Sequence, residues 1–582
     1  MVMRSTARSQ PSGDRNARVI VQVTQGHICG ATDVLPNGDP YYFFKGVPYA
    51  QPPIDELRFR SPVPIDRYPV SYMDCTKERN NCLGMDVITR EITGDEDGLY
   101  LNIYTPKVNR KDGTADLPVI VFFHGGGLVG GHADSSMYLP NYLVQEGVVV
   151  VTVNYRLGVL GFLYLPEVGL EGNAGLKDQR MALQWVHQNI ARFSGDPKNV
   201  TLFGASSGGV AGHYHCLSKE SKKYFQKAIL TSGSVFIDYA HQESPEEKAR
   251  QLARLLGHDP KTDEEVFKVL CKAPADKLFR LQFQVLTKRE KTFEKLFQIP
   301  FLPVIEREQS CDAIITKHPI ELMSEPNGIG IPILTGYNNR EGIMVLIDAV
   351  KHLDLYNKEP KRFIPRTLNL DYNSEEAREL GKEIKKFYFQ DKPVCQETVP
   401  QLVDLFTDKY LVAYPIITEM WARFQHNYKL FIYRFSFDGT LNKGKTLIPV
   451  APLKGAAHID EIYYLFSSPI LKTEIPETDP AYQMRQKMVR LFTNFAKHGD
   501  PTPSTVDDPL IDFKWTPVEN VPKNGAGLKM DLLSIKDNTH VGMEPMPERG
   551  RMQFWEKLFQ KYNGHIANIK IPTLPLDMNN NI

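Results

Sequence analysis

The sequence has 582 residues, of which 42% are hydrophobic and 24% are charged, both within the range of ordinary globular proteins. Its 69 basic and 69 acidic side chains give a formal net charge of +0 at pH 7, so no overall charge favours binding to nucleic acid or to an anionic membrane. No run of about 18 consecutive apolar residues occurs, so the sequence predicts no membrane-spanning helix.

The N-terminal stretch is polar and lacks the apolar core of a secretory signal. We therefore predict a flexible tail at 1–17 and a cytoplasmic protein, with organelle targeting as the alternative because the tail is rich in Arg and Ser. A second tail is expected at 563–582. The seven cysteines, an odd number, favour free thiols in a reducing compartment over a set of disulfides.

The chain begins with short strand-like segments separated by turn residues. Two longer, continuous apolar runs follow, at 117–126 and 147–158. Such runs suit the centre of a parallel sheet that is covered by helices. The segment 176–193 has apolar residues at helical spacing, which predicts a helix. Further buried strands are predicted at 199–204, 224–234, 331–339 and 428–437.

Buried strands and amphipathic helices alternate along most of the chain, which is typical of an α/β fold with a doubly wound sheet. No Pro- or Ser-rich linker divides the sequence. We therefore predict a single α/β domain over 18–562, with a large and mostly parallel central sheet flanked by helices.

A serine turn follows one of the predicted strands, in the stretch "NVTLFGASSGGV" at 199–210. It matches the pattern G-x-S-x-G with Ser206 at the centre. Glycines on both sides allow a sharp strand-to-helix turn that exposes the central hydroxyl. Ser207 lies off-centre, so its useful group is expected to be its backbone N–H. The motif alone is also compatible with a plain turn.

Three consecutive glycines end a buried strand in "FFHGGGLVGG" at 122–131. A serine nucleophile needs donors for the negative charge that develops on the substrate carbonyl oxygen, and glycine N–H groups are unobstructed by side chains. We predict that Gly126 and Gly127 supply two donors of this oxyanion hole and that the Ser207 N–H supplies a third. The alternative is a flexible loop.

The serine also needs a base, and in hydrolases of this type an acid and then a histidine follow the serine along the chain. His458 lies in "LKGAAHIDEIYYLF" (453–466), where small residues before it allow close approach to the serine turn. Glu341 follows a strand and a polar turn in "ILTGYNNREGIMV" (333–345). The spacing alone does not choose Glu341 from the other acids.

These segments, together with "FKGVPYAQPP", "DEDGLYLNIYTP", "NYRLGVLGFL" and "GNAGLKDQRMALQWVHQNIARFSGDPKNVTLFG", extend from about residue 18 to about residue 560. In them the sequence resembles the cholinesterase/carboxylesterase branch of the α/β-hydrolase superfamily, and within it the insect α-esterase-type carboxylesterases. The resemblance implies the α/β-hydrolase fold and no metal or organic cofactor.

The resemblance implies that Ser206 is the nucleophile, that His458 is the general base and that Glu341 is the acid that orients His458. It also implies the oxyanion hole given above and places Ser232 near the acid and the base. Two structural ion pairs are implied, Arg58 with Glu96 and Arg156 with Asp178. The substrate pocket is expected to include Leu128, Phe236 and Tyr239.

The sequence departs from the family at three places. Its turn reads G-A-S-S-G where G-E-S-A-G is usual, so Ala205 removes a polar group beside the nucleophile and a reduced rate or altered acyl turnover is expected. Leu128 replaces the commoner Phe after the three glycines. Gly98 stands where secreted relatives have the second cysteine of a disulfide, whose first cysteine would be Cys75 or Cys82, so that bridge cannot form in its usual place.

The resemblance implies a serine carboxylesterase that acts through an acyl-enzyme on small-molecule esters, expected to be lipophilic or xenobiotic and to include insecticide-type esters. Such an activity would place it in detoxification and insecticide resistance. Two alternatives stay open. One is a binder that reacts with organophosphates or esters and releases them slowly, which Ala205 favours. The other is a cholinesterase-like adhesion protein without catalysis. The sequence indicates neither the acyl-chain preference nor the oligomeric state.

Overall fold

The computed structural model describes residues 17–562, apart from 87–88, 109–112, 243, 289, 293–297, 326–327, 369, 425–427, 449–452 and 519–529. Apart from residue 17, the two predicted tails lie outside the described residues. In the described part of the chain, no helix is long and apolar enough to cross a membrane.

A 13-stranded sheet forms the centre of the molecule, and β5 and β6 form a separate pair. Its strands follow the order β1-β2-β3-β7-β9-β8-β10-β11-β12-β13-β14-β15, and β4 pairs with β2. The strand bounds are β1 Arg18–Val23, β2 Gly26–Val34, β3 Pro40–Pro48, β4 Tyr72–Asp74, β5 Gly84–Met85, β6 Ile92–Thr93, β7 Tyr100–Thr105, β8 Leu117–Phe123, β9 Val149–Val153, β10 Gly195–Ala205, β11 Lys227–Thr231, β12 Ile333–Asn338, β13 Leu430–Phe435, β14 Asp531–Ile535 and β15 Val541–Pro545.

The strands from β9 to β14 pair in parallel, whereas those near the two edges pair mostly antiparallel. Strand β8 shows why the central strands are apolar throughout. Val119, Val121 and Phe123 belong to one hydrophobic cluster, and Ile120 and Phe122 belong to the other. Because successive side chains point to opposite faces, both faces of the central sheet are buried.

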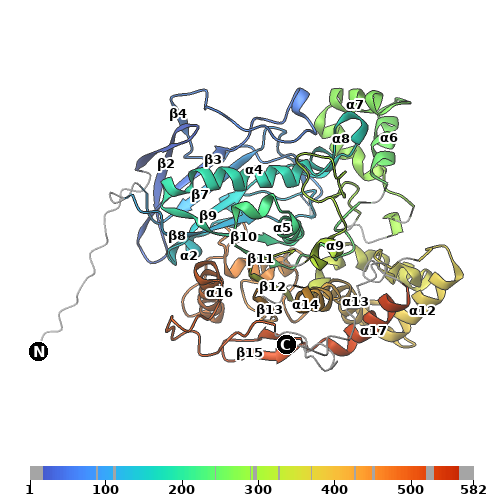
Figure 1. Ribbon diagram of the computed structural model, residues 1–582. Helices are drawn as coiled ribbons and strands as arrows, with labels where there is room; N and C mark the ends of the chain where they lie inside the picture. The colour runs from blue at the N-terminus through green and yellow to red at the C-terminus, as the bar shows by residue number, and fades with distance from the viewer. Residues whose placement is uncertain are drawn as a thin grey trace, which may run out of the picture.

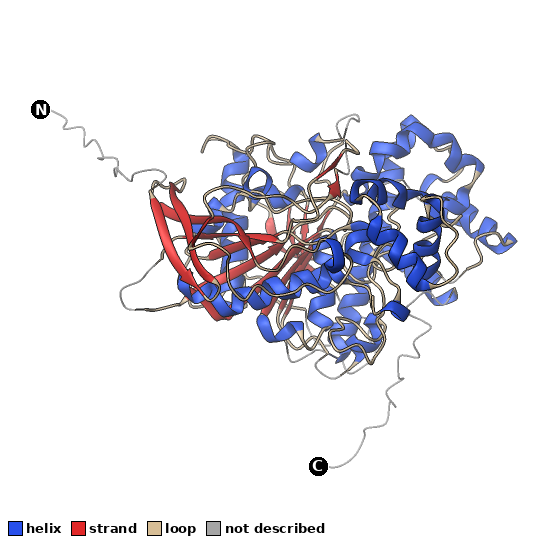
Figure 2. Ribbon diagram, turned by 90° about the horizontal axis from the view of Figure 1, so that it is seen from above, coloured by secondary structure: helices blue, strands red, loops and turns tan. Residues whose placement is uncertain are grey.

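Helices pack against both faces of this sheet (Figure 1 and Figure 2). Contacts place α4 and α5 against β10, on the opposite side from α16, which also contacts β10 and β8. The α-helices are α1 Ser135–Tyr138, α2 Asn141–Gln145, α3 Gly158–Phe162, α4 Ala174–Asn189, α5 Ser207–Leu217, α6 Pro245–Leu255, α7 Asp263–Lys272, α8 Ala275–Leu281, α9 Pro319–Ser324, α10 Leu346–Ala349, α11 Leu353–Lys358, α12 Glu375–Phe389, α13 Val399–Leu411, α14 Ala413–Phe424, α15 Lys443–Thr446, α16 Pro480–His498 and α17 Arg549–Lys561.

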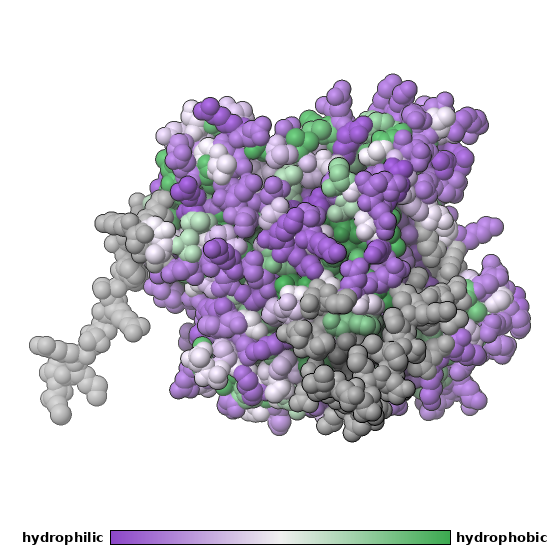
Figure 3. Space-filling view, viewed as in Figure 1, coloured by the Kyte–Doolittle hydropathy of each residue, from purple (hydrophilic) through white to green (hydrophobic). Residues whose placement is uncertain are grey.

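The predicted fold class is confirmed: the sheet is large, mostly parallel in its centre and covered by helices. The predicted helix at 176–193 is α4 followed by a 3-10 turn, Ile190–Phe193. The predicted strand at 199–204 is longer, because β10 begins at Gly195 and ends at Ala205 beside the serine turn. The single domain over 18–562 stays a prediction. Hydrophilic residues predominate on the face in Figure 3, with apolar residues scattered among them.

Candidate active site

Ser206 lies on the turn between strand β10 and helix α5. Its backbone has φ 56° and ψ −124°, a strained conformation for a residue with a side chain. The flanking glycines make the turn possible: a Cβ on Gly204 would lie 2.0 Å from the Gly208 carbonyl oxygen, and one on Gly208 would lie 2.1 Å from that of Phe123. The turn therefore excludes larger residues at both positions for steric reasons, as the motif predicts.

Three side chains from distant parts of the chain meet at this turn. Ser206 Oγ lies 2.6 Å from His458 Nε2, and His458 Nδ1 lies 2.5 Å from Glu341 Oε2. All three residues are buried. The structure thus brings together the predicted nucleophile, base and acid in the order that activation of a serine requires.

The carboxylate of Glu341 is fixed by two further hydrogen bonds. Its Oε1 accepts from the Ser232 hydroxyl at 2.6 Å and from the Asn338 backbone N–H at 2.8 Å. Ser232 directly follows β11, and Asn338 is the last residue of β12, which pairs with β11 in parallel. The carboxyl ends of these neighbouring strands therefore place the donors beside the acid.

The environment of His458 raises the pKa of its imidazole. Burial acts to lower that pKa, but the negative charge of Glu341 and its hydrogen bond to the ring act in the opposite direction and prevail. With its Nδ1 hydrogen directed at Glu341, the ring presents Nε2 to Ser206 as a proton acceptor. A buried imidazole held in this way is suited to general base catalysis.

The glycine loop after β8 lies next to the serine. A Cβ on Gly125 would come 2.8 Å from Ser206 Cβ, so the loop backbone runs directly beside the nucleophile. Gly126 and Gly127 have φ of 118° and 68°, a region that glycine tolerates and other residues disfavour. Both line the same cavity as Ser206, and Ser207 is the first residue of α5. The three predicted donors are thus gathered around the serine.

A cavity of about 290 Å³ contains Ser206 and His458 in its wall. Apolar and aromatic side chains predominate in that wall: Met85, Val129, Met137, Tyr138, Tyr239, Phe283, Ile299, Met344, Ile347, Leu447, Ile448, Ile462 and Tyr463. Asp86, Arg90 and His132 also line the cavity. Ala205, which replaces the usual polar residue, is also among the residues that line the cavity.

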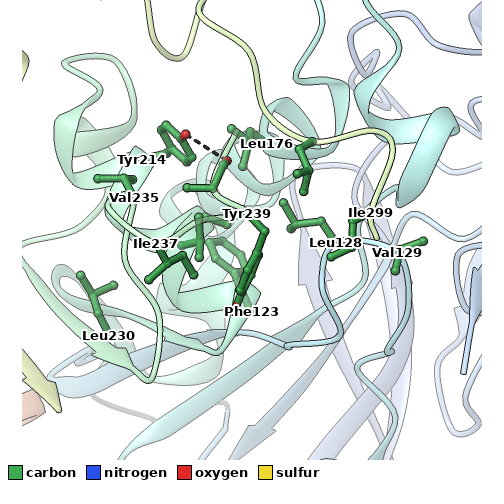
Figure 4. Packing of buried hydrophobic residues seen from close by; sticks show 14 of the residues in the cluster. Phe123, Leu128, Val129, Leu176, Tyr214, Leu230, Val235, Ile237, Tyr239 and Ile299 are labelled. Atoms are coloured by element: carbon green, nitrogen blue, oxygen red, sulfur yellow. Dashed lines mark hydrogen bonds between the residues drawn. The ribbon is translucent and has the colours of Figure 1, made fainter. Parts of the chain in front are cut away.

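Tyr239 is the only one of the three predicted pocket residues that lines this cavity. Leu128 lies in the hydrophobic core beside Ile299, as Figure 4 shows, and its backbone has a left-handed φ of 58°. Phe236 packs edge-to-face on the buried ring of His213, with 5.7 Å between ring centroids. Both side chains therefore contribute to core packing, and the pocket expectation for them is corrected.

Three polar residues near the triad, Asn338, Tyr433 and Glu461, escaped the sequence analysis. The Asn338 side-chain amide donates a hydrogen bond to Glu461, and the Tyr433 hydroxyl donates another to Glu461 at 3.3 Å. Burial, followed by the charge of Glu341, raises the pKa of Glu461 to about 7. Asp460 and Glu461, which follow His458 after Ile459, were the signal in the sequence, but only the fold shows that Glu461 lies behind the triad.

The two ion pairs that the resemblance implies are present. Arg58 Nη2 lies 2.5 Å from Glu96 Oε2, and Arg156 Nη2 lies 2.7 Å from Asp178 Oδ1. All seven cysteines are free thiols. Cys82, not Cys75, faces the glycine that replaces the second cysteine, because a Cβ on Gly98 would lie 2.8 Å from Cys82 Sγ. Among the described residues, no group of three or more His, Cys, Asp or Glu could hold a metal ion.

Comparison with known proteins gives a match to the model of the carboxylesterase family over residues 17–555. The chain belongs to the carboxylesterase family. This membership makes it a carboxylic ester hydrolase with the α/β-hydrolase fold, which agrees with the sheet order and with the serine turn at the end of β10.

Similar carboxylesterases come from several insects. The chain is 31% identical to esterase B1 of Culex pipiens over 547 residues, which cover 93% of this chain and 98% of that relative. It is 30% identical to the juvenile hormone esterase of Tribolium castaneum over 566 residues, covering 92% and 93%. A crystal structure of juvenile hormone esterase from Manduca sexta, with OTFP covalently attached, matches with a TM-score of 0.80 at 28% identity and covers 94% of this chain and 100% of that one.

Proposed function

We propose that this carboxylesterase hydrolyses neutral, lipophilic esters, including xenobiotic and insecticide-type esters, with Ser206, His458 and Glu341 as its catalytic triad. The observation that carries the proposal is the 2.6 Å distance between Ser206 Oγ and His458 Nε2 within the wall of a largely apolar cavity. A serine hydroxyl is a weak nucleophile until a base accepts its proton, and this arrangement supplies that base.

In the first half of the reaction, Ser206 Oγ attacks the carbonyl carbon of the ester while His458 Nε2 takes the hydroxyl proton. Glu341 stabilises the imidazolium that forms. The N–H groups of Gly126, Gly127 and Ser207 hold the oxyanion of the tetrahedral intermediate, an interaction that is made only as the charge develops. The imidazolium then protonates the leaving alcohol, and the acyl group stays on Ser206.

In the second half, a water molecule takes the place of the alcohol. His458 removes a proton from this water as it attacks the acyl carbon, and the same three N–H groups again hold the oxyanion. The intermediate collapses with return of the proton to Ser206 Oγ, and the carboxylic acid leaves. No step requires a metal ion or an organic cofactor.

The lining of the cavity supports the substrate class. Its side chains are mostly aliphatic, aromatic or thioether groups that favour apolar acyl and alcohol groups over charged ones. Arg90, one of its charged residues, is paired with Asp348 at 3.1 Å, so its charge is balanced within the protein. The relatives named juvenile hormone esterases and esterase B1 make lipophilic esters reasonable first substrates for this chain.

Ala205 favours a second candidate function, in which the protein captures organophosphates or esters and releases them slowly. Ala205 lies beside the nucleophile in the wall of the cavity, and its side chain lacks any polar group that could help to position the deacylating water. Under this alternative the acyl-enzyme forms rapidly and persists. A burst of one product equivalent followed by a slow steady rate would favour capture, whereas sustained turnover without a burst favours the esterase.

A panel of p-nitrophenyl esters of increasing acyl length, with wild type and Ser206→Ala compared, tests the proposed function. We expect wild type to turn over these esters and Ser206→Ala to lose on the order of a millionfold in kcat, because nucleophile loss removes the acyl-enzyme route. A serine-directed phosphonate should label wild type and leave the variant unlabelled.

Ser221→Ala is the matched control. Ser221 is also buried, and its Oγ lies 2.9 Å from His215 Nδ1 at the C-terminal end of α5, whereas Ser206 lies at the N-terminal end of that helix. This variant should keep wild-type turnover. Full activity of Ser206→Ala would contradict the triad, and an inert wild type that the phosphonate does not label would favour an adhesion protein built on the same scaffold.

A further inference from the structure

The glycine loop that carries two of the oxyanion donors contains a strained residue. Leu128 directly follows Gly127, and its φ of 58° lies in the left-handed region that residues with a side chain avoid. A strained backbone of this kind persists only where the surroundings hold it in place. The contacts of Leu128 therefore decide where the neighbouring Gly126 and Gly127 N–H groups point.

Hydrogen bonds hold the backbone of Leu128 on both sides. Its N–H donates to the Ser207 hydroxyl oxygen at 3.1 Å, across 79 residues of sequence. Its carbonyl oxygen accepts from the Gly158 N–H at 2.7 Å. Because Leu128 is buried, no solvent water replaces either partner if it is lost.

The Ser207 hydroxyl is itself enclosed by the same loop. Ser207 is 1% exposed, and it lies beside Tyr155, whose hydroxyl donates to the His124 carbonyl oxygen at 2.7 Å. Burial raises the pKa of Tyr155, and the neighbouring Ser207 hydroxyl acts to lower it. The ring of Tyr155 also stacks on that of His124, with 4.5 Å between centroids. The start of the glycine loop and its middle are thus both anchored around Ser207.

We propose that Ser207 is a positioning residue for the oxyanion hole. It acts through its side-chain hydroxyl, in addition to the backbone N–H that it contributes to the hole. By accepting from the Leu128 N–H, it locks the glycine loop against the serine turn, so that donors from two separate elements, the β8 loop and the start of α5, point at one substrate oxygen. Ser207 thereby fixes the donors on the glycine loop and supplies the donor at the start of α5.

The inference rests on the proposed function, because it concerns how the same site stabilises its transition state. An oxyanion hole works through preorganisation: its donors must already point at the developing charge, since reorientation during the reaction adds to the barrier. Loss of one donor costs about 10²–10³ in kcat, so a smaller displacement of two donors is expected to cost about tenfold. The substrate in its ground state carries little charge on that oxygen, so its binding is affected less.

The test compares wild type with Ser207→Ala, which keeps the backbone N–H and removes only the hydroxyl. We expect kcat and kcat/KM for a p-nitrophenyl ester to fall together by about tenfold, with KM within twofold of wild type. The affinity for a trifluoromethyl ketone, whose adduct with Ser206 places an oxyanion in the hole, should fall by a similar factor. If the substitution only loosened the fold, kcat and the ketone affinity would not be expected to fall by the same factor.

Two further variants complete the experiment. Ser221→Ala removes another buried serine hydroxyl and should leave kcat/KM and ketone affinity unchanged. If Ser207→Ala fails to fold, Ser207→Cys replaces it, because a thiol of similar size is a weaker acceptor and should give a loss in the same direction.

The positioning role is overturned if a folded Ser207 variant keeps kcat/KM and ketone affinity within twofold of wild type, or if KM alone rises. Ser206→Ala, measured beside it, separates this failure from that of the proposed function. Loss of activity in Ser206→Ala together with an unaffected Ser207→Ala would remove only the role of the hydroxyl.

Discussion

The catalytic turn and the wall of the cavity are built in different ways. At the turn, strained backbone at Ser206 and buried hydrogen bonds around Glu341 fix each group in one position. The wall is assembled from side chains of many segments between Asn81 and Tyr463. One of its ion pairs, Arg90 with Asp348, has side chains that are 37% and 16% exposed.

The fixed turn therefore carries the chemistry, and the wall of the cavity carries the specificity. A proton moves between partners only over hydrogen-bond distances, so the triad requires positions accurate to a fraction of an ångström. An apolar wall discriminates by shape, and changes of one methylene there alter transition-state binding by only about 1–3 kcal/mol. Substitutions at the turn should therefore act on every ester, whereas substitutions in the wall should act on some esters more than on others.

The largest of the following effects is expected from Glu341→Gln, a change at the catalytic turn. The amide would favour the wrong imidazole tautomer and remove the charge that stabilises the imidazolium, so kcat should fall by about 10⁴-fold for every ester in a panel. Steady-state kinetics with esters of short and long acyl chains would measure this. A loss that varied strongly with acyl length would contradict the uniform effect expected of the catalytic turn.

The pH profile tests the same region without a substitution. Because the base must be neutral, kcat/KM should fall about tenfold per pH unit once the pH drops below the pKa of His458. Glu341 raises that pKa, so the fall should begin above the ordinary histidine value of about 6.5. In Glu341→Gln the midpoint should move to lower pH. A flat wild-type profile down to pH 5 would argue against His458 as the base.

Ile299→Ala tests the wall. This side chain lines the cavity and lies against the glycine loop, since its Cδ1 would be 2.9 Å from a Cβ on Gly127. Removing it should enlarge the cavity and change the ratio of kcat/KM between long and short acyl esters by about tenfold in favour of the long ones. The ratio does not depend on how much of the enzyme is folded.

Ile320→Ala is the matched control for that change. Ile320 is fully buried in the same hydrophobic cluster but does not line the cavity, so its truncation should lower stability and leave the ratio unchanged. An equal shift in ratio for both variants would show that acyl preference follows general core packing and not the wall.

The smallest effect is expected at the edge of the cavity, from Arg90→Ala. Partly exposed ion pairs contribute about 0.2–1 kcal/mol, so the free energy of unfolding should fall by less than about 1 kcal/mol. For neutral esters kcat/KM should change by less than about threefold. Chemical denaturation and the ester panel measure both quantities. A large loss would mean that this pair belongs with the rigid catalytic region.

The residues that meet at the serine turn could be named from the sequence more readily than the residues of the wall, because the two regions depend on different ranges of interaction. The serine turn is encoded within a few residues: Gly204 and Gly208 leave room for backbone that any Cβ would block. The choice of Glu341 needed the family resemblance, because the separation of two residues along the chain does not give the distance between them in the folded protein. Leu128 and Phe236 were expected in the pocket wall, yet both side chains turn into the core.

The alternation of apolar strands and helices could be read from residue order alone, as could the sharp turn at Ser206 and the glycine loop, because each is a local consequence of residue type. The folded chain was needed to show which acid meets His458, that Cys82 faces Gly98, which residues line the cavity, and that Ser207 holds Leu128. Those relations join residues up to hundreds of positions apart, and packing of the sheet and its helices, not local preference, sets the distances between them.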